Sequence, residues 1–84
     1  MAKYTADEIR VGVKQLVAEI TERKPDQIGD TTLFGKDLGI DSLMATELMV
    51  AMERKYRIKI PEQEFTKIRN VEEAVAAAQR HLAS

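Results

Sequence analysis

Apolar residues recur every three or four positions in three separate stretches of this chain, a period that is typical of α-helices. They are Ile9, Val13, Leu16, Val17 and Ile20 in the first stretch, Leu43, Ala45, Leu48, Met49, Met52 and Tyr56 in the second, and Val71, Ala74, Val75, Ala78 and Leu82 in the third. The 84 residues include no cysteine, so one core must hold without disulfides. The sequence predicts one all-α domain over residues 1–84.

Capping residues and prolines set the expected helix boundaries. Thr5 and Glu8 form a capping box at the start of the first helix, which should end near residues 23–24, before Pro25. The second helix should run over residues 42–56. Pro61 suits the first position of a short third helix that runs through Phe65. Asn70 and Glu73 mark the start of the last helix. The pattern predicts a small four-helix bundle with a short third helix.

A long loop over residues 24–41 separates the first two expected helices. Its apolar residues can pin it to the core, so it is expected to be ordered. These are Ile28, Leu33, Phe34, Leu38 and Ile40. A short helical turn is expected at residues 30–32, and the alternation of residues 58–60 resembles a brief strand.

The hexapeptide Leu38-Gly39-Ile40-Asp41-Ser42-Leu43 places a serine where this loop meets the second helix. The first N–H groups of a helix lack partners within the helix and favour negative charge. A phosphodiester on Ser42 would lie in a favourable field. Gly39 permits a tight turn, and Asp41 can cap the helix. Taken alone, Ser42 could also be a plain helix cap.

This hexapeptide, with Leu33-Phe34 before it and Glu47-Leu48 and residues 58–61 after it, resembles the acyl carrier protein family over residues 5–82. The resemblance implies that Ser42 is esterified by 4′-phosphopantetheine, whose thiol carries acyl groups as thioesters. Gly39, Asp41 and Leu43 would flank the cofactor site. The chain would be a non-catalytic carrier for fatty-acid, specialised lipid or polyketide synthesis. Its partners would be a phosphopantetheinyl transferase, an acyl-loading enzyme, and synthases or acyltransferases.

The resemblance also implies a docking face on the second helix. Steps of three residues from Asp41 give Met44, Glu47, Val50 and Glu53. Arg54 and Ile60 complete the predicted docking set. The family is usually more acidic than this chain, whose net charge is −1. Arg54 and Lys55 add positive charge beyond the acidic residues. The face is therefore either a solvated surface or a docking surface with altered partner preference.

An acyl chain sheltered among the helices would need a lined space. The candidates are Phe34, Leu48, Met52, Ile60, Ile68 and Val75. An ordinary packed core would use the same residue types. Methionine is flexible enough for either role.

Several other chemistries are disfavoured. No metal-ligand pattern is present. A catalytic serine needs a base within hydrogen-bond reach, but the sole histidine, His81, lies far from Ser42 in sequence. His81 lies in the last turn of the last helix and is expected to be solvent-exposed. Arg54, Lys55, Arg57 and Lys59 form a basic cluster, but acidic neighbours and the weak net charge speak against nucleic acid. No apolar run could span a membrane, and residues 1–5 lack a signal-peptide core, so we expect a cytoplasmic protein. A monomer suits many partners.

Two other functions stay open. An aminoacyl carrier of the peptidyl or D-alanyl type would share the fold. Peptidyl carriers, however, usually have Gly-Gly before the residue that precedes the serine, where this chain has Leu38-Gly39-Ile40. A helical protein–protein adaptor would need no prosthetic group.

Overall fold

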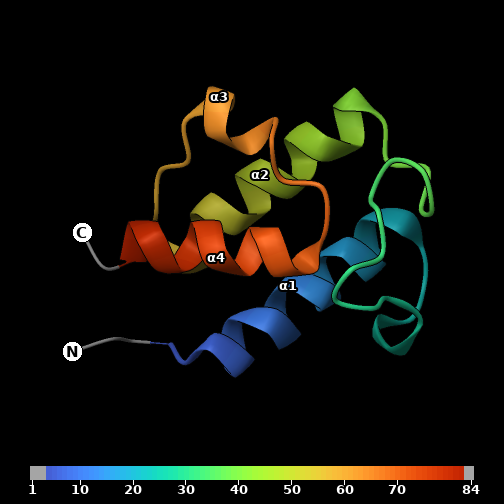
Figure 1. Cartoon of the computed structure of the whole chain (residues 1–84), viewed down its shortest axis with the longest axis horizontal. Helices are drawn as coiled ribbons and strands as arrows, with labels where there is room; N and C mark the ends of the chain where they lie inside the picture. Colours follow the sequence, from blue (N-terminus) through green and yellow to red (C-terminus); the bar gives the residue numbers. More distant parts are fainter. Residues whose placement is uncertain (1–3, 83–84) are drawn as a thin grey trace.

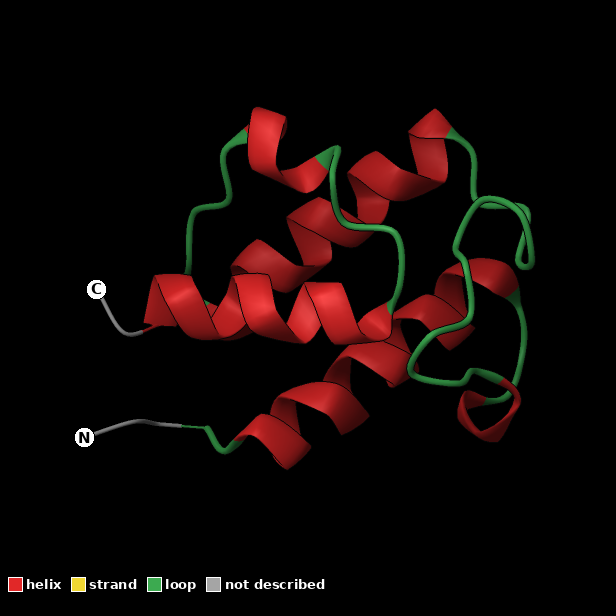
Figure 2. Cartoon of the chain, viewed as in Figure 1, coloured by secondary structure: helices red, strands yellow, loops and turns green. Residues whose placement is uncertain are grey.

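The computed structural model describes residues 4–82, which form helices joined by loops and contain no β-strand (Figure 2). The elements are α1 (Ala6–Thr21), the single 3₁₀ turn η1 (Pro25–Gln27), α2 (Ser42–Tyr56), α3 (Glu62–Phe65) and α4 (Val71–Leu82). The predicted all-α bundle of four helices, with a long first loop and a short third helix, is confirmed.

Helices α1, α2 and α4 pack around one core, and α3 lies beside α2 (Figure 1). The start of α1 and the end of α4 lie on one side of the molecule. The loop between α1 and α2 lies on the other side. The beginning of α2, where Ser42 stands, is therefore reached from the loop side.

Local capping explains the ends of α1. The Thr5 hydroxyl accepts the N–H of Glu8 at 3.1 Å, and the Glu8 carboxylate accepts the N–H of Thr5 at 2.8 Å. The helix ends at Thr21, before the predicted residues 23–24, because Glu22 adopts a left-handed conformation with φ 55°. The chain has thus already left the helix when it reaches Pro25.

The core is closely packed where α1 meets the end of α2. Gly12 is buried against Tyr56, whose hydroxyl donates a hydrogen bond to the carbonyl of Ile9 at 3.3 Å. A Cβ at residue 12 would overlap that hydroxyl. The apolar stripes supply most of the buried side chains, including Ile9, Val13, Val17, Leu48, Met52, Tyr56, Val71, Ala74, Val75 and Ala78.

The long loop is ordered, as predicted, because backbone hydrogen bonds attach it to the segment before α4. The N–H of Phe34 donates to the carbonyl of Arg69 at 2.8 Å, and the N–H of Glu72 donates to the carbonyl of Asp30 at 3.0 Å. Lys14 of α1 forms an ion pair with the Asp30 carboxylate at 2.8 Å. Its hydrogen bond holds the pKa of Asp30 below the usual value.

Four expectations were wrong. Residues 58–60 form no strand, because no second segment among residues 4–82 pairs with them and Ile58 and Ile60 instead turn towards the core. Residues 30–32 contain a turn without helix, and the helical turn of this loop is η1. Leu43 is 71% exposed, because it lies on the opposite side of α2 from the buried Met52. Leu33, expected to pin the loop, is partly exposed.

Residues 1–3, on which the expectation about a signal peptide partly rests, lie outside the described range. Within residues 4–82, no helix has the length and apolar character needed to cross a lipid bilayer.

Candidate functional site

Ser42 is the first residue of α2, and the cap of this helix is its neighbour Asp41. The Asp41 carboxylate accepts the N–H of Met44 at 2.9 Å, as predicted. The side chain of Ser42 is exposed, and within residues 4–82 its hydroxyl has no hydrogen-bond partner. The interpretation of Ser42 as a helix cap is therefore wrong, because Asp41 already satisfies that role and leaves the hydroxyl free.

The backbone around Ser42 favours a negatively charged group. The Asp41 carboxylate accepts a hydrogen bond from the N–H of Met44, and the Asp41 carbonyl accepts one from the N–H of Ala45. The N–H groups of Ser42 and Leu43 have no acceptor in the described part of the chain. Unpaired N–H groups and the positive end of the helix dipole both attract a phosphate. Gly39 has φ 68°, which confirms the expected tight turn just before this site.

Ser42 lies at the edge of a cleft between α2 and α3 with a volume of about 410 Å³. Its walls are Ala45, Thr46 and Met49 from α2, Glu62 and Phe65 from α3, and Thr66 and Ile68 beyond it. Most of this surface is apolar, and Thr46, Glu62 and Thr66 add polar groups. A group attached to Ser42 would therefore have an apolar surface beside it.

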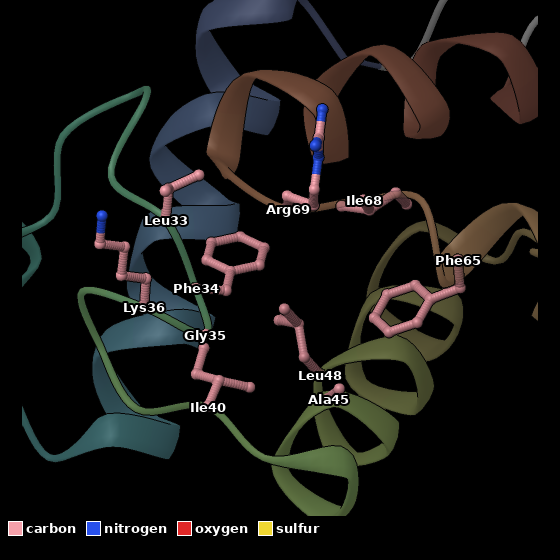
Figure 3. A pocket seen from close by; sticks show the side chains of 10 residues that line it. All are labelled: Leu33, Phe34, Gly35, Lys36, Ile40, Ala45, Leu48, Phe65, Ile68 and Arg69. Atoms are coloured by element: carbon pink, nitrogen blue, oxygen red, sulfur yellow. The ribbon is translucent and has the colours of Figure 1, made fainter.

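A second, mostly apolar cavity of about 330 Å³ adjoins this cleft and shares Ala45, Phe65 and Ile68 with it. Figure 3 shows that Phe34, Leu48 and Phe65 face a common space, while the charged ends of Lys36 and Arg69 point away from it. Its walls come from the long loop, α2, α3 and the segment before α4. The two spaces are neighbours along one side of α2.

Three of the six predicted cavity residues line this space. They are Phe34, Leu48 and Ile68. Met52, Ile60 and Val75 do not line it, because they are buried in the packed core. Sequence reasoning missed Leu33, Ile40, Ala45 and Phe65. The apolar loop residues were recognised as anchors, but no period in a loop indicates which side of the chain will line a cavity.

The outward face of α2 differs from the predicted docking set. The exposed side of α2 is formed by Leu43, Glu47, Val50 and Arg54. These residues are four, three and four positions apart, which keeps them on one face of the helix. Thr46, Glu47, Val50, Ala51 and Arg54 line a shallow groove on this face. Steps of three drift around the helix, which explains why Met44 and Glu53 are only half exposed.

Two members of the predicted docking set have structural roles instead. The Glu53 carboxylate accepts the N–H of Ile60 at 2.9 Å and so anchors the chain after α2. Ile60 is 3% exposed and lies in the core, so it does not belong to a surface. Asp41, Glu47, Val50 and Arg54 remain exposed.

A polar contact attaches α3 to the end of α4. The Nε2 atom of His81 lies 2.8 Å from Oε2 of Glu64, and Arg80 lies 3.3 Å from the same oxygen. The hydrogen bond with His81 holds the pKa of Glu64 below its usual value. The expectation that His81 is simply solvent-exposed was wrong, because the turn before α4 brings Glu64 against the last turn of α4.

The sequence matches the family model described as the phosphopantetheine attachment site over residues 11–78. An acyl carrier protein of Rickettsia bellii is 32% identical over 75 residues, which are 89% of this chain and 87% of that protein. The chain belongs to the acyl carrier proteins. The prosthetic group of this family is 4′-phosphopantetheine, and the free hydroxyl, unpaired N–H groups and open cleft at Ser42 fit such a group.

Other relatives of this acyl carrier protein differ in length and specialisation. The meromycolate extension acyl carrier protein of Mycobacterium bovis is 37% identical over 76 residues, which are 90% of this chain and 66% of that protein. This chain therefore spans just under two thirds of the length of that relative. A solved acyl carrier protein from Enterococcus faecalis has the same fold, with a TM-score of 0.79 at 23% identity, over 93% of this chain and 99% of that one.

Proposed function

We propose that Ser42 bears the 4′-phosphopantetheine arm and that the protein carries acyl intermediates of lipid synthesis on its thiol. The observation that supports the site most strongly is that the helix cap and the exposed hydroxyl belong to different residues at the start of α2. Asp41 caps the helix, so the exposed Ser42 hydroxyl stays available for a phosphodiester. The thioester would activate the acyl group, and the arm would raise its local concentration at each partner enzyme.

The two adjoining spaces beside Ser42 would receive part of the acyl chain. Their shared residues Ala45, Phe65 and Ile68 form an apolar path from the cleft to the cavity. Moving an apolar chain from water onto apolar surface is favourable by about 0.8 kcal/mol for each buried CH₂ group. This hydrophobic gain favours an acyl cargo over a small polar aminoacyl group.

The partners would be a phosphopantetheinyl transferase, an acyl-loading enzyme, and synthases or acyltransferases. The name of the Mycobacterium bovis relative places that protein in meromycolate extension. We propose that this carrier likewise serves a specialised lipid pathway, with fatty-acid or polyketide synthesis as the alternatives. A cytoplasmic location and a monomeric state stay predictions.

The test is intact-protein mass after incubation with coenzyme A, magnesium and a broad-specificity phosphopantetheinyl transferase. The wild-type protein should gain one phosphopantetheine, and Ser42→Ala should gain none. Thr46→Ala removes a hydroxyl one turn further along α2 and should be loaded like the wild type.

Stability separates loss of the site from loss of the fold. Since the hydroxyl of Ser42 makes no hydrogen bond within the described residues, Ser42→Ala should change the free energy of unfolding by less than about 0.5 kcal/mol. A folded wild-type protein that no transferase loads would contradict the carrier proposal and favour the adaptor without a prosthetic group.

A further inference from the structure

The end of α2 furthest from Ser42 carries four exposed cations that form no ion pair within residues 4–82. They are Arg54, Lys55, Arg57 and Lys59, here called the basic cluster. The Lys55 ammonium lies 5.9 Å from the centre of the Tyr56 ring. The whole chain has a net charge of −1, so the cluster is a local feature and not a consequence of a basic protein.

The helix dipole explains only half of the basic cluster. Arg54 and Lys55 lie in the last turn of α2, where positive charge is favourable. Arg57 lies beyond the helix at φ 54°, a conformation that glycine or asparagine adopts with less strain. Lys59 lies in the extended segment, between the inward side chains of Ile58 and Ile60. Within the described residues, the side chains of these last two cations form no hydrogen bond or ion pair.

The basic cluster continues the outward face of α2. Arg54 borders the shallow groove of about 440 Å³ that also contains Glu47, Val50 and Ala51. Val50 is 37% exposed, and Leu43 lies on the same face. The face thus has acidic residues near Ser42, apolar residues along its length and a basic end. An apolar centre with a charged rim is the anatomy of a protein–protein interface.

We propose that the basic cluster docks onto a carboxylate-bearing surface of a partner enzyme, an inference that rests on the proposed carrier function. Ser42 and Arg54 are twelve residues apart on one helix, which is about 18 Å along its axis. The acidic patch on the enzyme would therefore lie about that far from its active-site entrance, while basic residues near the entrance face Asp41 and Glu47. This polarity allows one orientation of α2 and excludes the reversed one.

A protein partner fits this face better than a polyanion. The exposed carboxylates of Asp41 and Glu47 lie on the same helix and would repel a nucleic acid or an anionic membrane. The apolar residues between the charges would gain nothing from a phosphate backbone. A folded partner can match both signs of charge and cover the apolar residues.

The test compares three probes by their effects on backbone amide NMR signals at low ionic strength: a peptide whose glutamate-rich end is joined by apolar residues to a lysine-rich end, phosphatidylglycerol vesicles and a DNA duplex. The peptide should shift the signals of residues 54–59. The variant R54E/R57E/K59E should bind it about tenfold more weakly. The control R23E/K24E/K67E makes the same change in net charge at exposed cations elsewhere and should bind within about twofold of wild type.

Each remaining outcome also decides the matter. Glutamate at residue 57 is compatible with the backbone, since Glu22 holds the same left-handed conformation. If R54E/R57E/K59E is unfolded, R54Q/R57Q/K59Q replaces it in the test. No shift at residues 54–59, equal loss in the control, or tighter binding of the vesicles or the duplex would overturn the inference. Phosphopantetheine loading is measured on the same samples. Failure to load wild type would contradict the carrier function, whereas normal loading without peptide binding would contradict only the inference.

Discussion

The two ends of α2 contrast in how they are packed. At the Tyr56 end, the ring lies edge-on to Tyr4 with centroids 5.0 Å apart, and Gly12 leaves no room for a methyl group. Burial raises the pKa of the Tyr56 hydroxyl to about 12. At the Ser42 end, two adjoining spaces of about 330 and 410 Å³ remain between α2, α3 and the loop. The Tyr56 end stabilises the fold and borders an open surface groove of about 380 Å³, whereas the Ser42 end leaves space between elements beside the attachment site.

The largest loss of stability should come from the packed end. Tyr56→Ala removes a buried ring and its hydrogen bond to Ile9, so the free energy of unfolding should fall by about 3–5 kcal/mol. Urea unfolding followed by circular dichroism measures this change. If the loss were below about 1 kcal/mol, this contact would not be a principal source of stability.

Gly12→Ala tests how closely this end is packed. Alanine favours a helix over glycine by about 1 kcal/mol, but its Cβ would overlap the Tyr56 hydroxyl and lie 2.9 Å from Cε of Lys55. We expect a net loss of about 1–3 kcal/mol by urea unfolding. Val11→Ala, at an exposed neighbouring position, is the control and should change stability by less than about 0.5 kcal/mol. A more stable Gly12→Ala variant would show that Tyr56 can move aside.

The open end should accept added volume more easily. Ala45→Leu places three more carbon atoms at a residue that lines both spaces, so its cost should stay below about 1 kcal/mol. The same variant should shorten the longest acyl chain that is protected inside the protein. Thioester hydrolysis rates across a series of chain lengths measure this effect. Equal rates for variant and wild type would argue against a sheltered chain.

The smallest effect concerns the contact of α3 with α4. The pKa of Glu64 is lower in the folded protein than its usual value of 4.5, so its ionised form stabilises the fold above that pH. This stabilisation is lost as the pH falls through the lowered pKa. Glu64→Gln should therefore cost less than about 1 kcal/mol at neutral pH. The difference from wild type should disappear in acid, and a difference that persisted there would show that packing matters more than charge.

Sequence patterns were sufficient where a period or a cap decided the structure. The stripes of α1 and α4, the Thr5–Glu8 box and Asp41 at the start of α2 all appear as predicted. Sequence patterns failed where tertiary contacts decide the structure. Nothing near Glu53 in sequence indicates that its carboxylate binds the N–H of Ile60, and the contact of His81 with Glu64 depends on how α3 folds back.

The candidate site was predicted only in part, for a similar reason. A motif identifies Ser42, but part of the walls of the adjoining spaces comes from a loop and a four-residue helix. Neither segment shows a regular spacing of apolar residues that would predict which side chains face the cavity. The error at Leu43 was avoidable, since helical spacing from Met52 places it on the outer face.

The most direct test of this account is an NMR comparison of the protein carrying unacylated phosphopantetheine with the same protein carrying a medium-length saturated acyl chain. We expect the methyl signals of Leu48, Ile40 and Ile68 to shift on acylation, while those of Val13 and Val17 stay in place. Shifts confined to the surface groove around Tyr4 and Val11, or no shifts at all, would contradict the proposal that the space beside Ser42 holds the cargo.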